Sequence, residues 1–118
     1  MAGRTEFVDF VLESLQPLGG VGARRMFGGW GIYKDGVMFA LVARDQLFLK
    51  VDDGNRAAYD EAGLLHFTYV EKGRPIRMSY REAPPEGFDD PDILCAWARD
   101  AHAAALRARK PKRRPSPS

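Results

Sequence analysis

Two glycine pairs in the N-terminal third of the chain have a spacing that could hold a phosphate group. Gly20 and Gly22, and then Gly29 and Gly31, each form a Gly-x-Gly sequence. A dinucleotide-binding loop needs a third glycine, and a phosphate-binding loop ends in Gly-Lys-Ser or Gly-Lys-Thr, neither of which occurs here. The glycines also stand between predicted strands, whereas phosphates bind before a helix. We therefore interpret them as backbone bends and expect no cofactor.

The side chains that could act as nucleophiles, bases or metal ligands are few and scattered. His66 and His102 fall on a predicted strand and a predicted helix, and the single cysteine of the chain cannot complete a zinc site with them. Cys95 lies in the first turn of the last predicted helix, where the helix dipole can lower a thiol pKa, but its apolar neighbours indicate a buried thiol. Ser14 and Ser79 lie outside any Gly-x-Ser-x-Gly sequence. We expect no catalytic residue, no metal site and no enzyme activity.

A run of cations near the C-terminal end suggests a negatively charged partner. Six of the 18 basic residues lie in the last twelve positions, where no acidic residue occurs: Arg107, Arg109, Lys110, Lys112, Arg113 and Arg114. Prolines from Pro111 onward oppose helix, so we expect residues 1–109 to form the domain and residues 110–118 a disordered basic tail. Such a tail can bind nucleic acid through its phosphates without reading sequence. It can equally be a solubilising terminus, and the sequence leaves both interpretations open.

The composition is that of one globular domain. The chain has 118 residues, of which 45% are hydrophobic and 29% charged. Its net charge of +2 comes from the tail, because residues 1–106 carry 12 basic and 16 acidic side chains. No apolar run approaches the roughly 18 to 20 residues of a membrane span, and acidic residues interrupt the N-terminus where a signal peptide would be apolar. We expect a cytoplasmic protein that does not bind membranes.

The N-terminal half predicts a helix followed by a three-stranded meander. Thr5 can cap a helix whose apolar residues from Phe7 to Leu15 fall on one face. Residues 24–33 are expected to form one bent strand, or a strand and a tight corner, because glycines interrupt them. The Asp35-Gly36 pair favours a tight hairpin turn. Two further strands are predicted over 37–42, which is apolar throughout as in a strand covered on both faces or lying mid-sheet, and over 46–51.

The C-terminal half predicts a short helix, a second hairpin and a long helix. A turn leads into a helix over about 56–62 that Gly63 ends, and strands are expected over 64–70 and 75–81. Met78 and Tyr80 alternate with Ser79 and Arg81, which predicts that the second pair faces water. Pro91 opens a helix that continues to about Arg109. The expected fold is α+β, a two-layer α-β(3)-α-β(2)-α arrangement with an antiparallel sheet packed against helices.

The central run, from Arg24 to Asp52, resembles the N-terminal domain of the TfoX/Sxy family of bacterial competence regulators. The resemblance rests on the MFGG-x-G-IY-x-DG-VMFAL block followed by LFLKVD, and it extends from about Phe7 to Leu106. It includes the F-x-Y-x-x-x-G-x-x-x-x-M-x-Y pattern that ends at Tyr80. The family implies a fold similar to type III secretion chaperones and no catalytic residues. Its best-known members act with the cyclic-AMP receptor protein at promoters and have a second, helical domain, whereas only the basic tail follows Leu106 here.

Three functional hypotheses follow from these observations. The first is a non-enzymatic interaction module in transcription regulation, a stand-alone version of the family domain that binds a protein partner through its sheet or a helix face. By analogy with chaperone-like folds, we expect it to form a homodimer. The second is a nucleic-acid accessory protein that binds through the basic tail. The third, an enzyme acting on a small ligand, would require Arg24, Arg25, Tyr33 and His66 to converge on one pocket.

Overall fold

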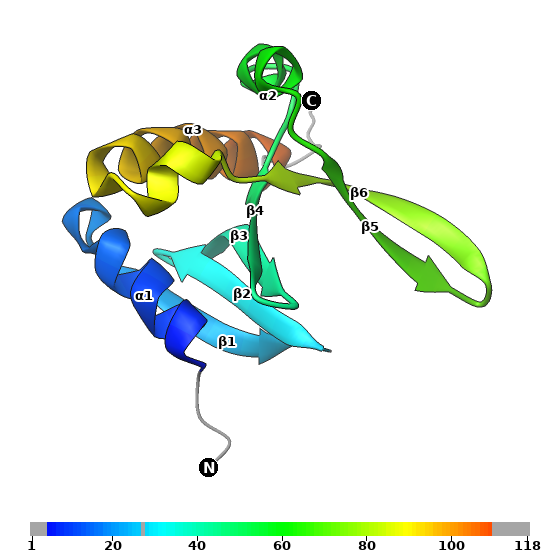
Figure 1. Ribbon diagram of the computed structural model, residues 1–118, viewed down its shortest axis with the longest axis horizontal. Helices are drawn as coiled ribbons and strands as arrows, with labels where there is room; N and C mark the ends of the chain where they lie inside the picture. Colours follow the sequence, from blue (N-terminus) through cyan, green and yellow to red (C-terminus); the bar gives the residue numbers. More distant parts are fainter. Residues whose placement is uncertain (1–4, 27, 110–118) are drawn as a thin grey trace, which may run out of the picture.

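A computed structural model of the protein describes residues 5–26 and 28–109 (Figure 1). In this part of the chain three α-helices and two short 3₁₀ helices accompany six strands. The elements in chain order are α1 (Glu6–Ser14), η1 (Gln16–Leu18), β1 (Val21–Met26), β2 (Gly29–Lys34), β3 (Val37–Ala43), β4 (Gln46–Lys50), α2 (Arg56–Ala62), β5 (His66–Glu71), β6 (Arg74–Glu82), η2 (Pro85–Phe88) and α3 (Pro91–Arg109). The predicted α+β class is confirmed.

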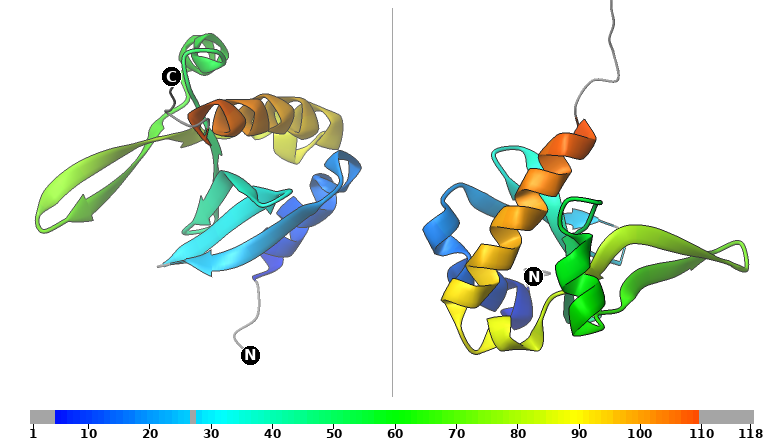
Figure 2. Two further views of the ribbon diagram at one scale, coloured as in Figure 1. Left: turned by 180° about the vertical axis from the view of Figure 1, so that it is seen from behind. Right: turned by 90° about the horizontal axis from the view of Figure 1, so that it is seen from above.

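The strands form one antiparallel sheet in the order β1-β2-β3-β4-β6-β5. The first four follow one another as a meander, and the chain then passes through α2 before the β5–β6 hairpin joins the sheet through β6. This hairpin projects beyond the body of the domain as an arm, as Figures 1 and 2 show. Asp35 and Gly36 both have a positive φ, of 52° and 82°, which confirms the predicted tight turn between β2 and β3.

Four strands precede α2, where the sequence predicts three. β1 and β2 form a hairpin with Met26 opposite Gly29, in place of the bent strand or strand and corner expected over residues 24–33. Gly28 has a positive φ of 74°, and a side chain at Gly29 would collide with the Val42 carbonyl oxygen of β3. The glycines therefore reverse the chain instead of bending it. The corrected order is α-β(4)-α-β(2)-α.

The main core lies between one face of the sheet and the helices α1 and α3 (Figure 1). Thr5 caps α1 as predicted, since its Oγ1 accepts a hydrogen bond from the Val8 N–H at 3.1 Å. The two helices pack apolar side chains against those of the middle strands. The core contains Val8 and Val11 of α1, Leu94 of α3, and Ile32, Phe39 and Leu49 of the strands. Cys95 is also buried here, where its Sγ–H donates to the Ser14 carbonyl oxygen and desolvation raises the pKa of the thiol. The prediction of a buried thiol is confirmed.

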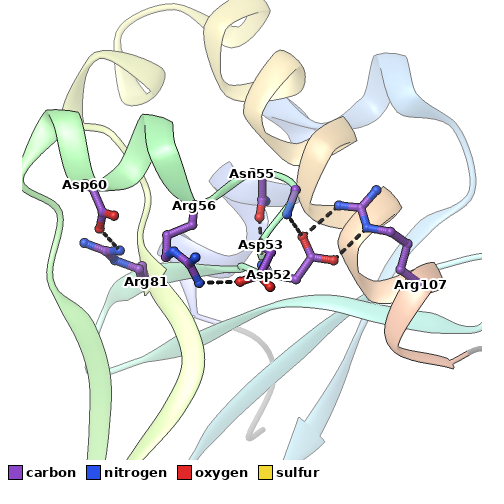
Figure 3. Close-up of polar contacts among 8 residues, drawn as sticks. Asp52, Asp53, Asn55, Arg56, Asp60, Arg81 and Arg107 are labelled. Atoms are coloured by element: carbon purple, nitrogen blue, oxygen red, sulfur yellow. Dashed lines mark hydrogen bonds and ion pairs between the residues drawn. The ribbon is translucent and has the colours of Figure 1, made fainter.

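The alternation of β6 predicts that Arg81 faces water, but this residue is buried beneath α2. Only 6% of this residue is exposed, because it pairs with Leu49 in the register and shares the helix-covered face. Its Nε–H and Nη2–H groups donate to the Leu64 carbonyl oxygen at 3.0 and 2.6 Å, and Nη1–H donates to Asp60 (Figure 3). Tyr59 packs between this guanidinium and the Trp97 ring. These contacts fix a helix that is too short to be stable alone.

Replacing the buried arginine should therefore destabilise the domain. We expect Arg81→Met to lower the free energy of unfolding by about 2 kcal/mol, because the buried Leu64 carbonyl oxygen loses its donors. Urea unfolding followed by circular dichroism measures the change. Arg99→Met, at an exposed position of α3, is the matched control and should stay within about 0.5 kcal/mol of wild type. Equal stabilities of the two variants would contradict this role of Arg81.

Candidate protein-interaction surface

The sheet face opposite the main core carries a second apolar cluster, which we call the open face. Leu41, Phe48 and Tyr80 are buried at its centre. The partly buried side chains packed against them are Met38, Ala43, Phe67 and Met78. All of these residues belong to β3, β4, β5 or β6, so within the described residues no helix contributes to the cluster. In Figure 1 the helices lie on the other side of the central strands.

The two-sided burial of β3 follows from an irregularity in its pairing with β2. Ile32 pairs with Ala40 and Tyr33 pairs with Met38, which leaves Phe39 as an extra residue. Such a bulge turns two successive side chains toward the same side. Phe39 and Ala40 both enter the main core, while Met38 belongs to the open face. Of the two sequence interpretations of the apolar run over 37–42, a strand covered on both faces or a strand in the middle of the sheet, the structure shows the second.

A hollow of about 280 Å³ opens on this face between the β1–β2 hairpin and the β5–β6 arm. Its lining is almost entirely apolar and includes Met26, Trp30, Leu41, Phe67 and Met78. Pockets for small ligands and cofactors begin at about 300 Å³ and combine apolar walls with converging polar groups. The hollow therefore has the size and chemistry to accept one or two apolar side chains of a partner.

Gly31 leaves the space in which the side chains of Met26, Tyr33 and Met38 come together on the open face. A Cβ built at this position would lie 2.9 Å from the Met26 sulfur, 2.9 Å from the Tyr33 ring and 3.0 Å from the Met38 sulfur. These three side chains consequently pack over the bare backbone of β2. The glycine that resembles part of a phosphate loop in the sequence is a site of close side-chain approach.

Cations surround the apolar centre. The Arg24 guanidinium lies 5.0 Å from the centroid of the Tyr33 ring, and the Lys50 ammonium lies 5.4 Å from that of Tyr80. A second hollow, of about 220 Å³, is lined by Lys50, Tyr80 and Arg109 where α3 ends. None of the carboxylate ion pairs between described residues involves Arg24, Lys50 or Arg109. These three residues are the cationic rim.

The structure separates the predicted tail cations into different settings. Arg107 belongs to the last turn of α3 and forms a bidentate pair with Asp52, with Nε–Oδ2 and Nη2–Oδ1 distances of 2.7 and 2.8 Å (Figure 3). This guanidinium and the Gly54 N–H hold the pKa of the Asp52 carboxyl down at about 2. Arg109 lies at the cationic rim. The other four, Lys110, Lys112, Arg113 and Arg114, lie outside the described residues.

The four residues proposed for a small-ligand enzyme do not converge. Arg24 lies over Tyr33, whereas its neighbour Arg25 lies over the Trp30 ring at 5.6 Å. His66 lines a separate hollow beneath α2 with Asp52 and other residues. In the described residues, no group of three or more His, Cys, Asp or Glu side chains is placed to hold a metal ion. None of the described helices combines the length and apolar character needed to cross a membrane.

Comparison with protein families identifies the chain. A sequence model of the TfoX N-terminal domain matches residues 13–105. The chain belongs to the TfoX N-terminal domain family. No curated protein matches it. The match extends from α1 into α3, so the whole sheet and its open face lie within the TfoX N-terminal domain, and the resemblance seen in the central run is confirmed.

Sequence reasoning did not locate the open face of this TfoX N-terminal domain. Met26, Met38 and Met78 come from three different strands, and only the strand order brings them onto one face. The signal available in the sequence is that β3 is apolar on both faces while the predicted helices are too few to cover both. That signal predicts an uncovered face but does not say which one.

The Asp52–Arg107 pair should make stability depend on pH in acid. Because the folded pKa of Asp52 is lowered from 3.8 to about 2, its contribution is complete above the unfolded value and is lost as the pH falls toward 2. We expect the unfolding free energy of wild type to fall more steeply between pH 5 and 2 than that of Asp52→Asn, measured by urea unfolding. Asp53→Asn, which affects only an exposed pair with Arg56, should follow wild type. Parallel curves for all three proteins would refute this assignment.

Proposed function

We propose that this TfoX N-terminal domain is a non-enzymatic interaction module of the cytoplasm that regulates transcription during competence for DNA transformation. The observation that carries the proposal is the open face, an apolar sheet surface with a hollow for side chains and no covering helix in the described residues. Apolar surface of this kind marks interaction sites in globular proteins. The competence role comes from the family, whose regulators act at promoters beside the cyclic-AMP receptor protein.

The domain contributes a rigid docking platform to this role. The centre of the open face is carried by β3 and β4, which have paired neighbours on both sides, so its backbone is fixed before a partner arrives. A partner that covers the partly buried side chains of this face, among them Met38, Phe67 and Met78, removes apolar surface from water and is held without any chemical step. A homodimer is also part of the proposal, and sedimentation that finds only monomer at micromolar concentration would count against that part.

Disrupting the open face should abolish the biological role without unfolding the domain. Met78 is only half-buried there, so Met78→Asp places a charge against the partner with little effect on the core. In a deletion strain of the native host, we expect wild type to restore transformation frequency and Met78→Asp not to restore it. Arg99→Glu, on the exposed side of α3, should restore it like wild type. Equal protein levels are checked by immunoblot.

Two results would overturn the proposal in different ways. An unchanged transformation frequency in the deletion strain would remove the competence role. Full rescue by Met78→Asp would remove the open face as the functional surface.

A second candidate function is nucleic-acid binding through the basic C-terminal run. Arg107 is already neutralised by Asp52, so five cations remain for phosphates, namely Arg109, Lys110, Lys112, Arg113 and Arg114. If all five contact duplex DNA, the slope of log K against log salt should be about −4.5. Deleting residues 110–118 should bring that slope close to −1 in a fluorescence anisotropy titration. An unchanged affinity after deletion would eliminate this candidate.

A further inference from the structure

We propose that the open face binds an acidic amphipathic helix of a protein partner, with apolar residues of the helix in the two hollows and its carboxylates on the cationic rim. The inference rests on the proposed function and specifies the partner of the same surface. Three features of the described residues carry it: the shape of the apolar centre, the sign of the charge around it, and the paired state of the strands beneath it.

The apolar centre is shaped for protruding side chains. The larger hollow, of about 280 Å³, has Met26, Phe67 and Met78 in its wall. The smaller, of about 220 Å³, lies at the edge of the open face, where Met38 and Tyr80 meet the end of α3. A hollow on the open face and a second one at its edge suit two apolar residues spaced by a helical turn or more. Methionine is unbranched and adapts to irregular partners, and it is common on surfaces that receive amphipathic helices.

The charge around the centre selects an acidic partner. Residues 1–106 are acidic overall, yet the acidic residues of the sheet are confined to Glu71 of β5 and Glu82 of β6, and β1, β2, β3 and β4 contain no Asp or Glu. The rim of the open face carries Arg24, Lys50 and Arg109. Complementary charge around an apolar centre gives specificity and speeds association. A partner with carboxylates beside its apolar residues meets each of these cations with the opposite sign.

The same charges disfavour a second copy of this chain as the occupant. A two-fold interface places the same patch on both sides. Two open faces brought together would therefore oppose one cationic rim to another. The expected homodimer must then form elsewhere, and the open face stays available in it.

The paired strands favour a helix over an extended segment. β2, β3, β4 and β6 each have a hydrogen-bonded neighbour on both sides, so a chain lying across them finds no free backbone groups. A partner segment with its backbone in contact with apolar side chains must satisfy its own N–H and C=O groups. An α-helix does so internally, whereas an added strand could bind only at the edges, β1 and β5.

Selection from a random peptide library on the full chain tests the proposal. The displayed peptides are about 16 residues long, enough for a helix to form on binding. We expect enriched sequences with apolar residues at i, i+3 or i+4 and i+7, flanked by Asp and Glu. The best peptide is then titrated by fluorescence. A fluorophore attached to the peptide reports binding through its anisotropy.

Variants of the surface make the test specific. The double change Arg24→Glu and Lys50→Glu should weaken the acidic peptide about tenfold or more, as expected when exposed charge pairs become repulsive. A peptide with its acids replaced by lysine should bind this variant better than it binds wild type. Met78→Asp should prevent binding of the acidic peptide. Arg99→Glu, with circular dichroism to verify folding of every variant, changes the net charge outside the open face and should leave affinity unaltered.

The outcomes separate the partner's chemistry from the function of the surface. Enrichment of neutral or basic peptides that still require Met78 would overturn the acidic partner and leave the interaction surface intact. Peptides that bind Met78→Asp as well as wild type would refute the open face as their site. If no peptide is enriched, and Met78→Asp converts a dimer to monomer in sedimentation, the occupant is a second copy and the inference fails.

Discussion

The apolar burial required on both faces of β3 is the constraint on which the rest of the structure depends. Phe39 and Ala40 enter the helix-covered core together because of the bulge opposite β2, while Met38 and Leu41 remain on the other side. α1 and α3 cover one side of the central strands and leave the other without a helix among the described residues. The open face therefore exists because β3 has apolar side chains on both faces, whereas the described helices cover only one of them.

Two arginines connect the remaining elements to this sheet in physically different ways. Arg81 is buried, and its hydrogen bonds satisfy a carbonyl oxygen that has no strand partner at that position, so its role is to compensate desolvation. Arg107 is half-exposed and holds the end of α3 to the loop after β4 through Asp52. One contact sets the position of α2, and the other sets the position of the end of α3 beside the smaller hollow.

The sequence predicted local features well and the arrangement of faces poorly. Thr5 acts through its own side-chain oxygen, and Asp35-Gly36 and Gly63 act through their own backbone geometry, so the residue types alone were sufficient. The β1–β2 hairpin was not anticipated, since a glycine that bends a strand and one that reverses it give the same local pattern. Arg81 was misassigned for a different reason: alternation along a strand distinguishes two faces but not which one another element will cover. The open face joins residues from strands distant in sequence, and only pairing order brings them together.

The methionine lining of the open face has a consequence for how this surface can change over evolutionary time. A wall of branched or aromatic side chains fits one shape, and each substitution in the bound protein must be matched by another in the wall. Flexible thioethers at Met26, Met38 and Met78 can rearrange around a new contour at small cost. The bound sequence can then drift, or be exchanged for an unrelated one, while this domain stays unaltered, so the same small platform can be retained in regulatory circuits with different components.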